Sequence, residues 1–264
     1  MLTRHHAESA AELLWTHWQE GTRLAALPPQ VRPATRAEGY AIQAEFERRS
    51  RAPLYGWKIA ATSVAGQKHI NVDGPLAGRI LAERVRDAAA PLPFGANAMR
   101  VAEAEFAFRF GRDLAPRTKP YVVAEVLDAV ESLHPAIEVP DSRYDAFVSV
   151  GAPQLIADNA CAHDFVLGPA TTAPWRSMDL IEHPVKGIVA GKLERDGKGI
   201  NVLGDPRVAL TWIANELSQL GIALKAVQVV TTGTCVIPLP IAPGDAVVAD
   251  FGPIGRLDIR FAAA

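Results

Sequence analysis

The chain has 264 residues, 49% of them hydrophobic, and a formal net charge of -2 at pH 7. This composition is sufficient for the buried core of one large or two small domains and excludes a chain that is disordered throughout. The near balance of acidic and basic residues gives no reason to expect a nucleic acid or an anionic membrane as a partner. We therefore expect a site for a small molecule.

Two further features of the sequence bear on where in the cell the protein is located. No apolar run reaches the roughly 20 residues of a membrane helix, and the first residues, Met1 to Glu8, lack the apolar core of a signal peptide. We expect a cytoplasmic protein. Its two cysteines, Cys161 and Cys235, have neither the spacing of a zinc site nor that of a disulfide framework, so we expect reduced thiols.

The first fifty residues read as helical. Apolar positions recur at helical spacing over residues 7 to 20, and Gly21 follows as a left-handed cap. Thr35 and Glu38 have the spacing of a capping box for a second helix that runs through Arg49. We expect residues 1–50 to form a helical segment that packs on a catalytic unit of residues 51–264.

A single lysine, Lys58, interrupts the strand-like apolar run from Leu54 to Ser63. A lysine in such a place either extends from an edge strand to water or acts, desolvated, as a donor to an anionic or carbonyl substrate. Residues 67 to 78, which follow, read as a loop because Asp73-Gly74-Pro75 is a turn signal.

From Ala102 to Phe110 the even positions are apolar, while the odd positions include Glu103 and Glu105. This alternation predicts a strand whose two glutamates lie on one face, roughly 7 Å apart. Glutamates on such a face often only meet water, but these two are also placed to share one cation.

Glu138 lies in the apolar run from Pro135 to Pro140, where an unpaired carboxylate is costly to bury. Apolar residues recur at helical spacing from Val123 to Leu133, so we expect a helix that returns the chain to the same site. Three carboxylates with open positions for water or substrate favour Mg²⁺ or Mn²⁺ over Zn²⁺.

The rest of the chain alternates strands and helices. Two strand-like runs between Val185 and Val202 flank Asp196-Gly197, which predicts a hairpin turn at that dipeptide. Asp205 and Pro206 begin a helix that ends near Gly221. The chain after Val227 has the alternation of strands.

With these residues in view, the chain resembles the 2-keto-4-pentenoate hydratase branch of the fumarylacetoacetate hydrolase family, which also contains 4-oxalocrotonate decarboxylases. The resemblance covers nearly the whole chain. It rests on six segments in order: Gly39 to Gln43, Gly56 to Ile59 with Thr62-Ser63, Glu103 to Phe108, Pro135 to Glu138 with Asp141 to Arg143, Ala157 to Ala160, and Thr232 to Thr234 with Pro243 to Asp245.

The resemblance implies an α+β fold with a mixed β-roll or sandwich core preceded by N-terminal helices. It also implies a divalent metal, Mg²⁺ or Mn²⁺, and cytoplasmic homo-oligomers that act in aromatic-compound degradation. Carried over by position, Glu103, Glu105 and Glu138 match the family's metal ligands, and Lys58 matches its active-site lysine. These are the residues that the spacing itself selects.

Two positions depart from the pattern. Leu76 stands where the hydratases have a catalytic acid, and Cys161 replaces the hydroxyl of an Asp-Asn-Ala-Ser segment. Asp73, three residues before Leu76, is a candidate for the missing acid, and Cys161 for a catalytic role. Thr234 and Arg143 are candidates for binding substrate, although an arginine after a turn is as often an ordinary surface charge.

These observations predict a hydratase that adds water to a 2-hydroxypenta-2,4-dienoate-type 2-oxo acid, giving a 4-hydroxy-2-oxo acid. A 4-oxalocrotonate-type decarboxylase would use the same chelate but needs a pocket for a second carboxylate, for which Arg143 is a candidate. A protein that binds metal and 2-oxo acids without catalysis is the alternative from another class.

Overall fold

The structure is a computed structural model, and it describes residues 2–263 of the chain. The helices are α1 (Arg4–Glu20), α2 (Arg36–Arg49), α3 (Val64–His69), α4 (Val123–Asp128), α5 (Ala152–Ala157) and α6 (Pro206–Gln219). The strands are β1 (Gly56–Ala60), β2 (Leu76–Ile80), β3 (Val101–Phe110), β4 (Val130–Val139), β5 (Asp164–Leu167), β6 (Pro184–Val189), β7 (Leu193–Lys198), β8 (Val229–Thr234), β9 (Leu239–Pro240), β10 (Ala246–Asp250) and β11 (Arg256–Arg260).

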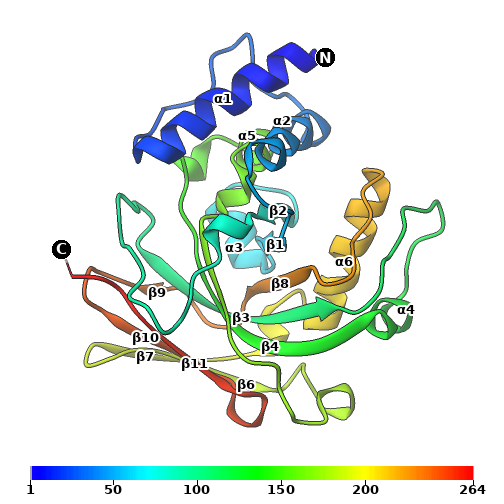
Figure 1. Cartoon of the computed structure of the whole chain (residues 1–264), viewed down its shortest axis with the longest axis vertical. Helices are drawn as coiled ribbons and strands as arrows, with labels where there is room; N and C mark the ends of the chain where they lie inside the picture. Colours follow the sequence, from blue (N-terminus) through cyan, green and yellow to red (C-terminus); the bar gives the residue numbers. More distant parts are fainter. Residues whose placement is uncertain (1, 264) are drawn as a thin grey trace.

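Two sheets form the core (Figure 1). The larger one is mixed, in the order β2-β1-β8-β3-β4-β5, with β9 added beside β3; the smaller one is antiparallel, in the order β11-β10-β6-β7. The apolar side of β3 packs between them, where the ring of Phe106 lies 4.9 Å, centroid to centroid, from that of Phe251, the residue after β10. The predicted α+β class with a mixed β core is confirmed.

Helix α1 ends at the predicted Gly21, and α2 begins at the predicted Thr35 cap and ends at the predicted Arg49, whereas α1 begins at Arg4, three residues before its predicted start. The Thr3 and Thr35 hydroxyls accept from the backbone N–H groups of His6 and Glu38, and Gly21 closes α1 with a φ of 66°. Helices α1, α2 and α5 lie together at one end of the molecule, above β1 and β2 (Figure 1). Gln43 of α2 donates to the carbonyls of Ala77 and Ile156, and so ties the helices to β2 and α5.

The helix predicted from Val123 to Leu133 is wrong beyond its first half. Helix α4 ends at Asp128, and β4 begins at Val130. Strand β4 pairs with β3 from Val130 to Glu138, and this long antiparallel pairing outweighs the local helical spacing of the apolar residues. The chain therefore returns to the site as the strand beside β3.

Two other local predictions also need correction. The β6–β7 hairpin turns at Gly191, with a φ of 73°, whereas Asp196 and Gly197 lie inside β7. A Cβ on Gly197 would lie 2.1 Å from the Cys235 carbonyl oxygen, so this glycine serves close packing. Residues 67 to 78, which were predicted to form a loop, instead begin within α3 and end in β2. All five residues of β2 are buried.

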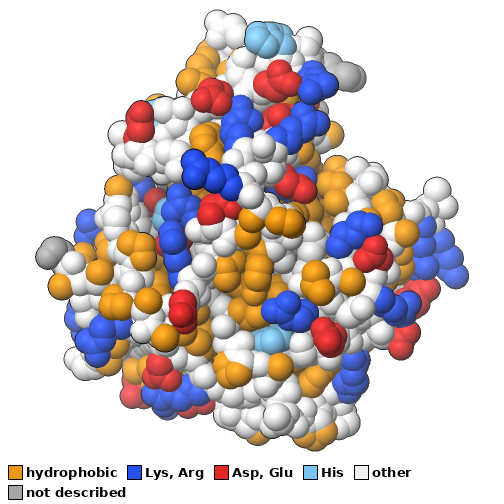
Figure 2. Space-filling view, in the orientation of Figure 1, with side chains coloured by type: hydrophobic (Ala, Val, Ile, Leu, Met, Phe, Trp, Pro, Cys, Tyr) orange, Lys and Arg blue, Asp and Glu red, His pale blue; other side chains and the backbone are white. Residues whose placement is uncertain are grey.

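No helix within residues 2–263 is long and apolar enough to cross a membrane. On the face shown in Figure 2, basic and acidic side chains are interspersed with apolar ones, and neither sign dominates. This mixed surface agrees with the small net charge of the chain.

Candidate metal centre

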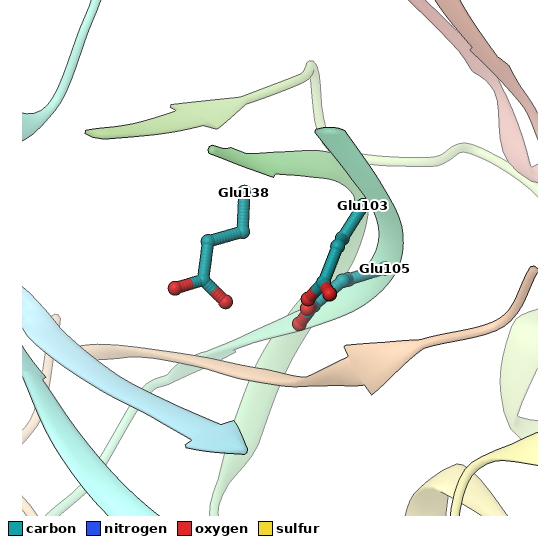
Figure 3. Close-up of side chains that lie close together, drawn as sticks. All are labelled: Glu103, Glu105 and Glu138. Atoms are coloured by element: carbon teal, nitrogen blue, oxygen red, sulfur yellow. The ribbon is translucent and has the colours of Figure 1, made fainter. Parts of the chain in front are cut away.

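The three glutamates meet because of the register between β3 and β4. Glu103 lies directly opposite Glu138, and Glu105 is two residues further along the same face of β3. One carboxylate oxygen from each lies within 4.8 Å of the others. Figure 3 shows the carboxylates of Glu103 and Glu105 side by side and that of Glu138 across from them, all directed into one space.

Glu105 is held by a bulge in the neighbouring strand. Its Oε2 accepts from the Thr231 hydroxyl and, at 2.7 Å, from the backbone N–H of Gly233. Two residues of β8, Thr232 and Gly233, lie opposite the single residue Phe106 of β3 at this point, so the bulge turns both donors toward the carboxylate. Gly233 is required there, because its φ is 97° and a Cβ would lie 2.1 Å from Thr62 Oγ1.

The other oxygen of Glu105, Oε1, is buried and has no hydrogen-bond partner among the described residues; the same holds for both oxygens of Glu138. Lys58 Nζ lies 3.0 Å from Glu138 Oε1 as an ion pair without hydrogen-bond geometry. Buried carboxylate oxygens left unsatisfied in this way cost several kcal/mol unless a cation completes their coordination. Glu105 Oε1 and Glu138 Oε2, which have neither a hydrogen bond nor an ion pair among the described residues, are therefore free to act as ligands.

The charges point to a divalent ion. Burial, and then the charge of Glu138, raise the pKa of Glu103 to about 7, and burial together with the neighbouring carboxylates raises that of Glu105 well above its usual range. Burial also raises the pKa of Glu138 despite the nearby ammonium. Three carboxylates and one ammonium leave a formal charge of -2, which a hard divalent cation with oxygen ligands neutralises.

Lys58 forms the opposite wall of the centre. Burial opposes its charge, but Glu138 and then Glu103 outweigh this effect, so the pKa of Lys58 is raised and its ammonium stays protonated. The same Nζ donates to the Ala160 carbonyl at 3.0 Å. Strands β1 and β4 are three neighbours apart, or about 14 Å in a flat sheet, so only a curled sheet lets Lys58 reach Glu138.

The segment beside Lys58 has an unusual backbone. Asn159, Ala160 and Cys161 have φ values of 55°, 50° and 60°, and all three are buried. A left-handed conformation costs about 1–2 kcal/mol for a residue other than glycine, so the surroundings must hold this turn in place. Burial, and then Asp158, raise the pKa of the Cys161 thiol to about 12. Cys161 is therefore a neutral thiol near Lys58 and not an activated nucleophile.

Leu76 lies on the same face of the sheet as Lys58, because Ala60 pairs with Leu76 where Lys58 pairs with Gly78. Its side chain is fully buried in the apolar core. The structure does not bring Asp73 to this wall: its side chain is 86% exposed and lies 3.5 Å from Arg36 Nη1. Asp73 is thus a surface residue and does not replace the acid that is absent at Leu76.

Arg143 is occupied by the protein itself. Its guanidinium donates to both a carboxylate oxygen and the backbone carbonyl of Asp158, and to the carbonyls of Asp141 and Ala162. With 2% of its surface exposed and four of its five N–H donors bonded within the protein, it is a buried structural cation and not an exposed site for a substrate carboxylate. Thr234 lies opposite Glu105 in the ladder, but its hydroxyl donates to the Val236 carbonyl at 2.7 Å.

Four groups at the site were not predicted: the Thr231 hydroxyl, the Gly233 amide, the Ala160 carbonyl and the Asn159 side chain. Gly233 and the Asn159-Ala160 pair belong to segments that carry the family resemblance, so their place in the sequence was a usable signal. Their contacts were not, because they depend on a bulge and on a left-handed turn that no local pattern specifies.

Comparisons with known proteins find relatives over nearly the whole chain, although no protein-family model matches it. The chain is 30% identical over 263 residues to a 2-keto-4-pentenoate hydratase of Paraburkholderia xenovorans, covering 98% of this chain and 96% of the relative. It is also 30% identical to the 2-hydroxyhexa-2,4-dienoate hydratase of Comamonas testosteroni, over 99% of both chains.

Among solved structures, the 4-oxalocrotonate decarboxylase of Pseudomonas putida, complexed with magnesium and adipate, matches with a TM-score of 0.89 at 25% identity, over 99% of both chains. A fumarylacetoacetate hydrolase family protein from Yersinia pestis matches in fold alone, with a TM-score of 0.58 at 13% identity over 78% of this chain and 91% of that one. Identity over nearly the full length and this fold together show that the chain belongs to the 2-keto-4-pentenoate hydratase branch of the fumarylacetoacetate hydrolase family.

Proposed function

We propose that the protein is a divalent-metal-dependent hydratase, a lyase that adds water to a small 2-hydroxy-2,4-dienoic acid in aromatic-compound degradation. The observation that carries the proposal is the centre of three converging glutamates faced by Lys58. It occurs in a chain whose relatives, over nearly its whole length, are named hydratases of such acids.

The net reaction is simple to balance. In 2-hydroxypenta-2,4-dienoate, loss of the hydroxyl proton at C2 and gain of a proton at C5 give an unsaturated 2-oxo acid. A water molecule then supplies a hydroxyl to C4 and a proton to C3, so the product is a 4-hydroxy-2-oxo acid. No oxidant or other co-substrate is needed.

Glu103, Glu105 and Glu138 are the residues that would hold Mg²⁺ or Mn²⁺. A bound cation would supply a Lewis acid for the carboxylate and the C2 oxygen of the substrate. Two related structures support this choice, since the 4-oxalocrotonate decarboxylase is complexed with magnesium and adipate in one and with calcium and acetate in the other.

The chain's own contribution is positioning and charge. Lys58 stays protonated, so it can pair with the substrate carboxylate and stabilise negative charge as the dienol loses its proton. Thr231 and Gly233 fix the orientation of Glu105. Because Leu76 offers no acid, we assign the proton at C5 to water.

Decarboxylation of a 4-oxalocrotonate-like diacid is the second candidate, and the 0.89 TM-score to such an enzyme favours it. That reaction needs a site for the second carboxylate. Arg143, the cation predicted for this role, is buried, forms an ion pair with Asp158 and uses four of its five N–H donors within the protein. Release of CO₂ from such a diacid, without incorporation of water, would decide for this alternative.

The assembly and location belong to the same proposal. We expect a cytoplasmic homo-oligomer, and Val64, Val227 and Ile237, each at least 67% exposed, are candidates for contacts between subunits. We also expect residues 1–50 to remain with residues 51–264 as one compact unit, supported by the Trp18–His163 and Arg23–Asp141 contacts. Light scattering would measure the number of subunits.

The test follows the ultraviolet absorbance of 2-hydroxypenta-2,4-dienoate with purified protein and Mg²⁺. We expect the absorbance to decay with wild-type protein and with the control Glu131→Gln, whose exposed side chain lies on β4. It should persist with Glu105→Gln or in excess chelator. Unchanged absorbance with metal-loaded wild type would refute the substrate assignment; if oxalate nevertheless bound only with Mg²⁺, the protein would be a 2-oxo acid binder without catalysis.

A further inference from the structure

The left-handed turn beside Lys58 has a structure that the proposed reaction does not by itself explain. Three consecutive residues other than glycine have positive φ values in the buried interior, namely Asn159, Ala160 and Cys161. Such conformations persist only where the surroundings impose them, and they concentrate at functional sites. The contacts of the turn show what it holds.

The first of these contacts is a clamp on β2. The Asn159 side chain accepts from the backbone N–H of Arg79 at 2.6 Å and donates to the backbone carbonyl of the same residue at 2.8 Å. It therefore satisfies both backbone groups of Arg79, as a neighbouring strand would. This clamp fixes the turn to the strand that lies directly beside β1 and Lys58.

The second contact is close packing around the lysine stem. A Cβ on Gly78 would lie 2.5 Å from the Asn159 carbonyl oxygen and 3.0 Å from both Cγ and Cδ of Lys58. Gly78 is also the residue directly opposite Lys58 in the β1–β2 ladder. The turn, β2 and the lysine stem thus fit together only with glycine at this position.

The third contact is with the ammonium itself. The Ala160 carbonyl, at the middle of the turn, accepts from Lys58 Nζ at 3.0 Å, while the same nitrogen lies 3.0 Å from Glu138 Oε1. An ammonium has three N–H donors. The Ala160 carbonyl therefore takes one N–H, the ion pair with Glu138 holds the ammonium on its other side, and N–H donors remain for an anionic group bound at the centre.

We propose that Asn159 and Gly78 are positioning residues that act through Lys58: together they lock the left-handed turn so that the Ala160 carbonyl aims the ammonium at the substrate carboxylate. The proposal rests on the proposed function for the identity of the substrate. Its test includes oxalate binding, which does not require turnover. Neither residue contacts the three glutamates in the described structure, so metal binding should not depend on them.

The main variant is Asn159→Gly. Glycine adopts a positive φ without steric cost, so this substitution removes only the two side-chain hydrogen bonds to Arg79. We expect kcat to fall about tenfold or more and the Kd for oxalate on Mg²⁺-loaded protein to rise about fivefold, because an ångström of misplacement is costly at a reacting centre. The Kd for Mg²⁺ should stay within about twofold. Asn71→Gly is the matched control, since Asn71 also has a positive φ, 53°, but lies exposed in a turn.

A double-mutant cycle separates positioning from general loss of structure. In a Lys58→Met background, Asn159→Gly should change oxalate affinity and residual turnover by less than about twofold, because its effect passes through the lysine. The proposal is wrong if the losses of oxalate affinity and kcat caused by the two single substitutions multiply in the double variant. It is also wrong if Asn159→Gly alone has the oxalate affinity and kcat of the wild type. These results are readable from oxalate binding even if the dienoate is not the substrate.

A second variant covers the case in which Asn159→Gly does not fold. Gly78→Ala places a methyl group against the turn and the lysine stem, so it should show the same pattern of weak oxalate binding with intact Mg²⁺ binding. Its control is Gly74→Ala, where a Cβ would meet no atom within 4 Å. Wild-type oxalate affinity in Gly78→Ala would overturn the role assigned to this glycine.

Discussion

The glutamate wall, formed by β3 and β4, and the lysine wall, formed by β1, β2 and the turn from Asn159 to Cys161, are built from different kinds of backbone. The first places its ligands through regular strand pairing, with Glu103 directly opposite Glu138. The second places Lys58 against a left-handed turn of three residues. The difference separates the half that we propose binds the metal, which has ordinary strand geometry, from the half that we propose faces the substrate, which depends on strained, close packing.

The walls also differ in how this chain departs from the family pattern. The glutamate wall keeps every residue expected of it. The lysine wall carries both departures, with Leu76 buried on the face of Lys58 and Cys161 at the end of the turn. We infer that this chain departs from the family pattern in the groups that deliver protons and not in its candidate metal ligands.

The largest effect is expected on the glutamate wall. Glu105→Gln removes a ligand charge whose Oε1 has no other partner among the described residues, so we expect Mg²⁺ affinity to fall at least about tenfold and turnover at least about a hundredfold. Without metal, the same variant should be more stable than wild type, because it relieves repulsion among the three carboxylates. Metal titration and thermal unfolding would measure both. Unaltered Mg²⁺ affinity would mean that the glutamates are not the ligands.

A smaller but still large effect is expected on the lysine wall. Lys58→Met should lower turnover by roughly a hundredfold, because a positioned charge at the reacting centre is lost. Its effect on the metal-free protein should be opposite to that of Glu105→Gln: stability should fall, since the ammonium faces three buried carboxylates. The control is Lys186→Met, at an exposed position of β6. A metal-free Lys58→Met protein as stable as wild type would contradict this balance of charges.

The pH dependence of stability should distinguish the metal-free from the loaded centre. The pKa of Glu103 is raised from 4.5 to about 7, so between these values the folded chain keeps a proton that the unfolded chain has released. Raising the pH through that window therefore removes stability, by up to about 1.4 kcal/mol per pH unit for one such group. Calorimetric unfolding in chelator should show this decline, and excess Mg²⁺ should abolish it. A metal-free protein whose stability does not fall across this window would contradict the raised pKa.

The smallest effect is expected at Cys161. Cys161→Ser restores a hydroxyl of similar size at a residue whose thiol stays protonated, so kcat should change by less than about threefold. Steady-state kinetics would measure the change in kcat. The control variant is Ser149→Cys, which makes the reverse exchange at an exposed position. A loss of a hundredfold would give the thiol a direct role and would move it into the catalytic machinery.

The same contrast explains what the sequence could predict. Alternation along β3 predicts that Glu103 and Glu105 share a face, and the cost of burying a lone charge singles out Glu138. The helices α1, α2 and α6 follow from their capping residues. These features depend on neighbours within a few residues along the chain, which a local pattern records.

The errors lie where distant segments decide the structure. Strand β4 forms because it pairs with β3, and Gly197 is needed because the Cys235 carbonyl packs against it. The turn at Asn159 has no local signal of three positive φ values, and only its contacts with Arg79 and Lys58 account for it. Arg143 looked available for substrate because its partner Asp158 lies 15 residues away along the chain.

The most direct test of the proposed hydration is product analysis by mass spectrometry after turnover of 2-hydroxypenta-2,4-dienoate with Mg²⁺ in oxygen-18-labelled water. The account predicts a 4-hydroxy-2-oxo acid that carries one labelled oxygen bound at C4, once label that has exchanged into the 2-oxo group is washed out by back-exchange in unlabelled water before analysis. A product without label at C4, or unconverted dienoate, would contradict it.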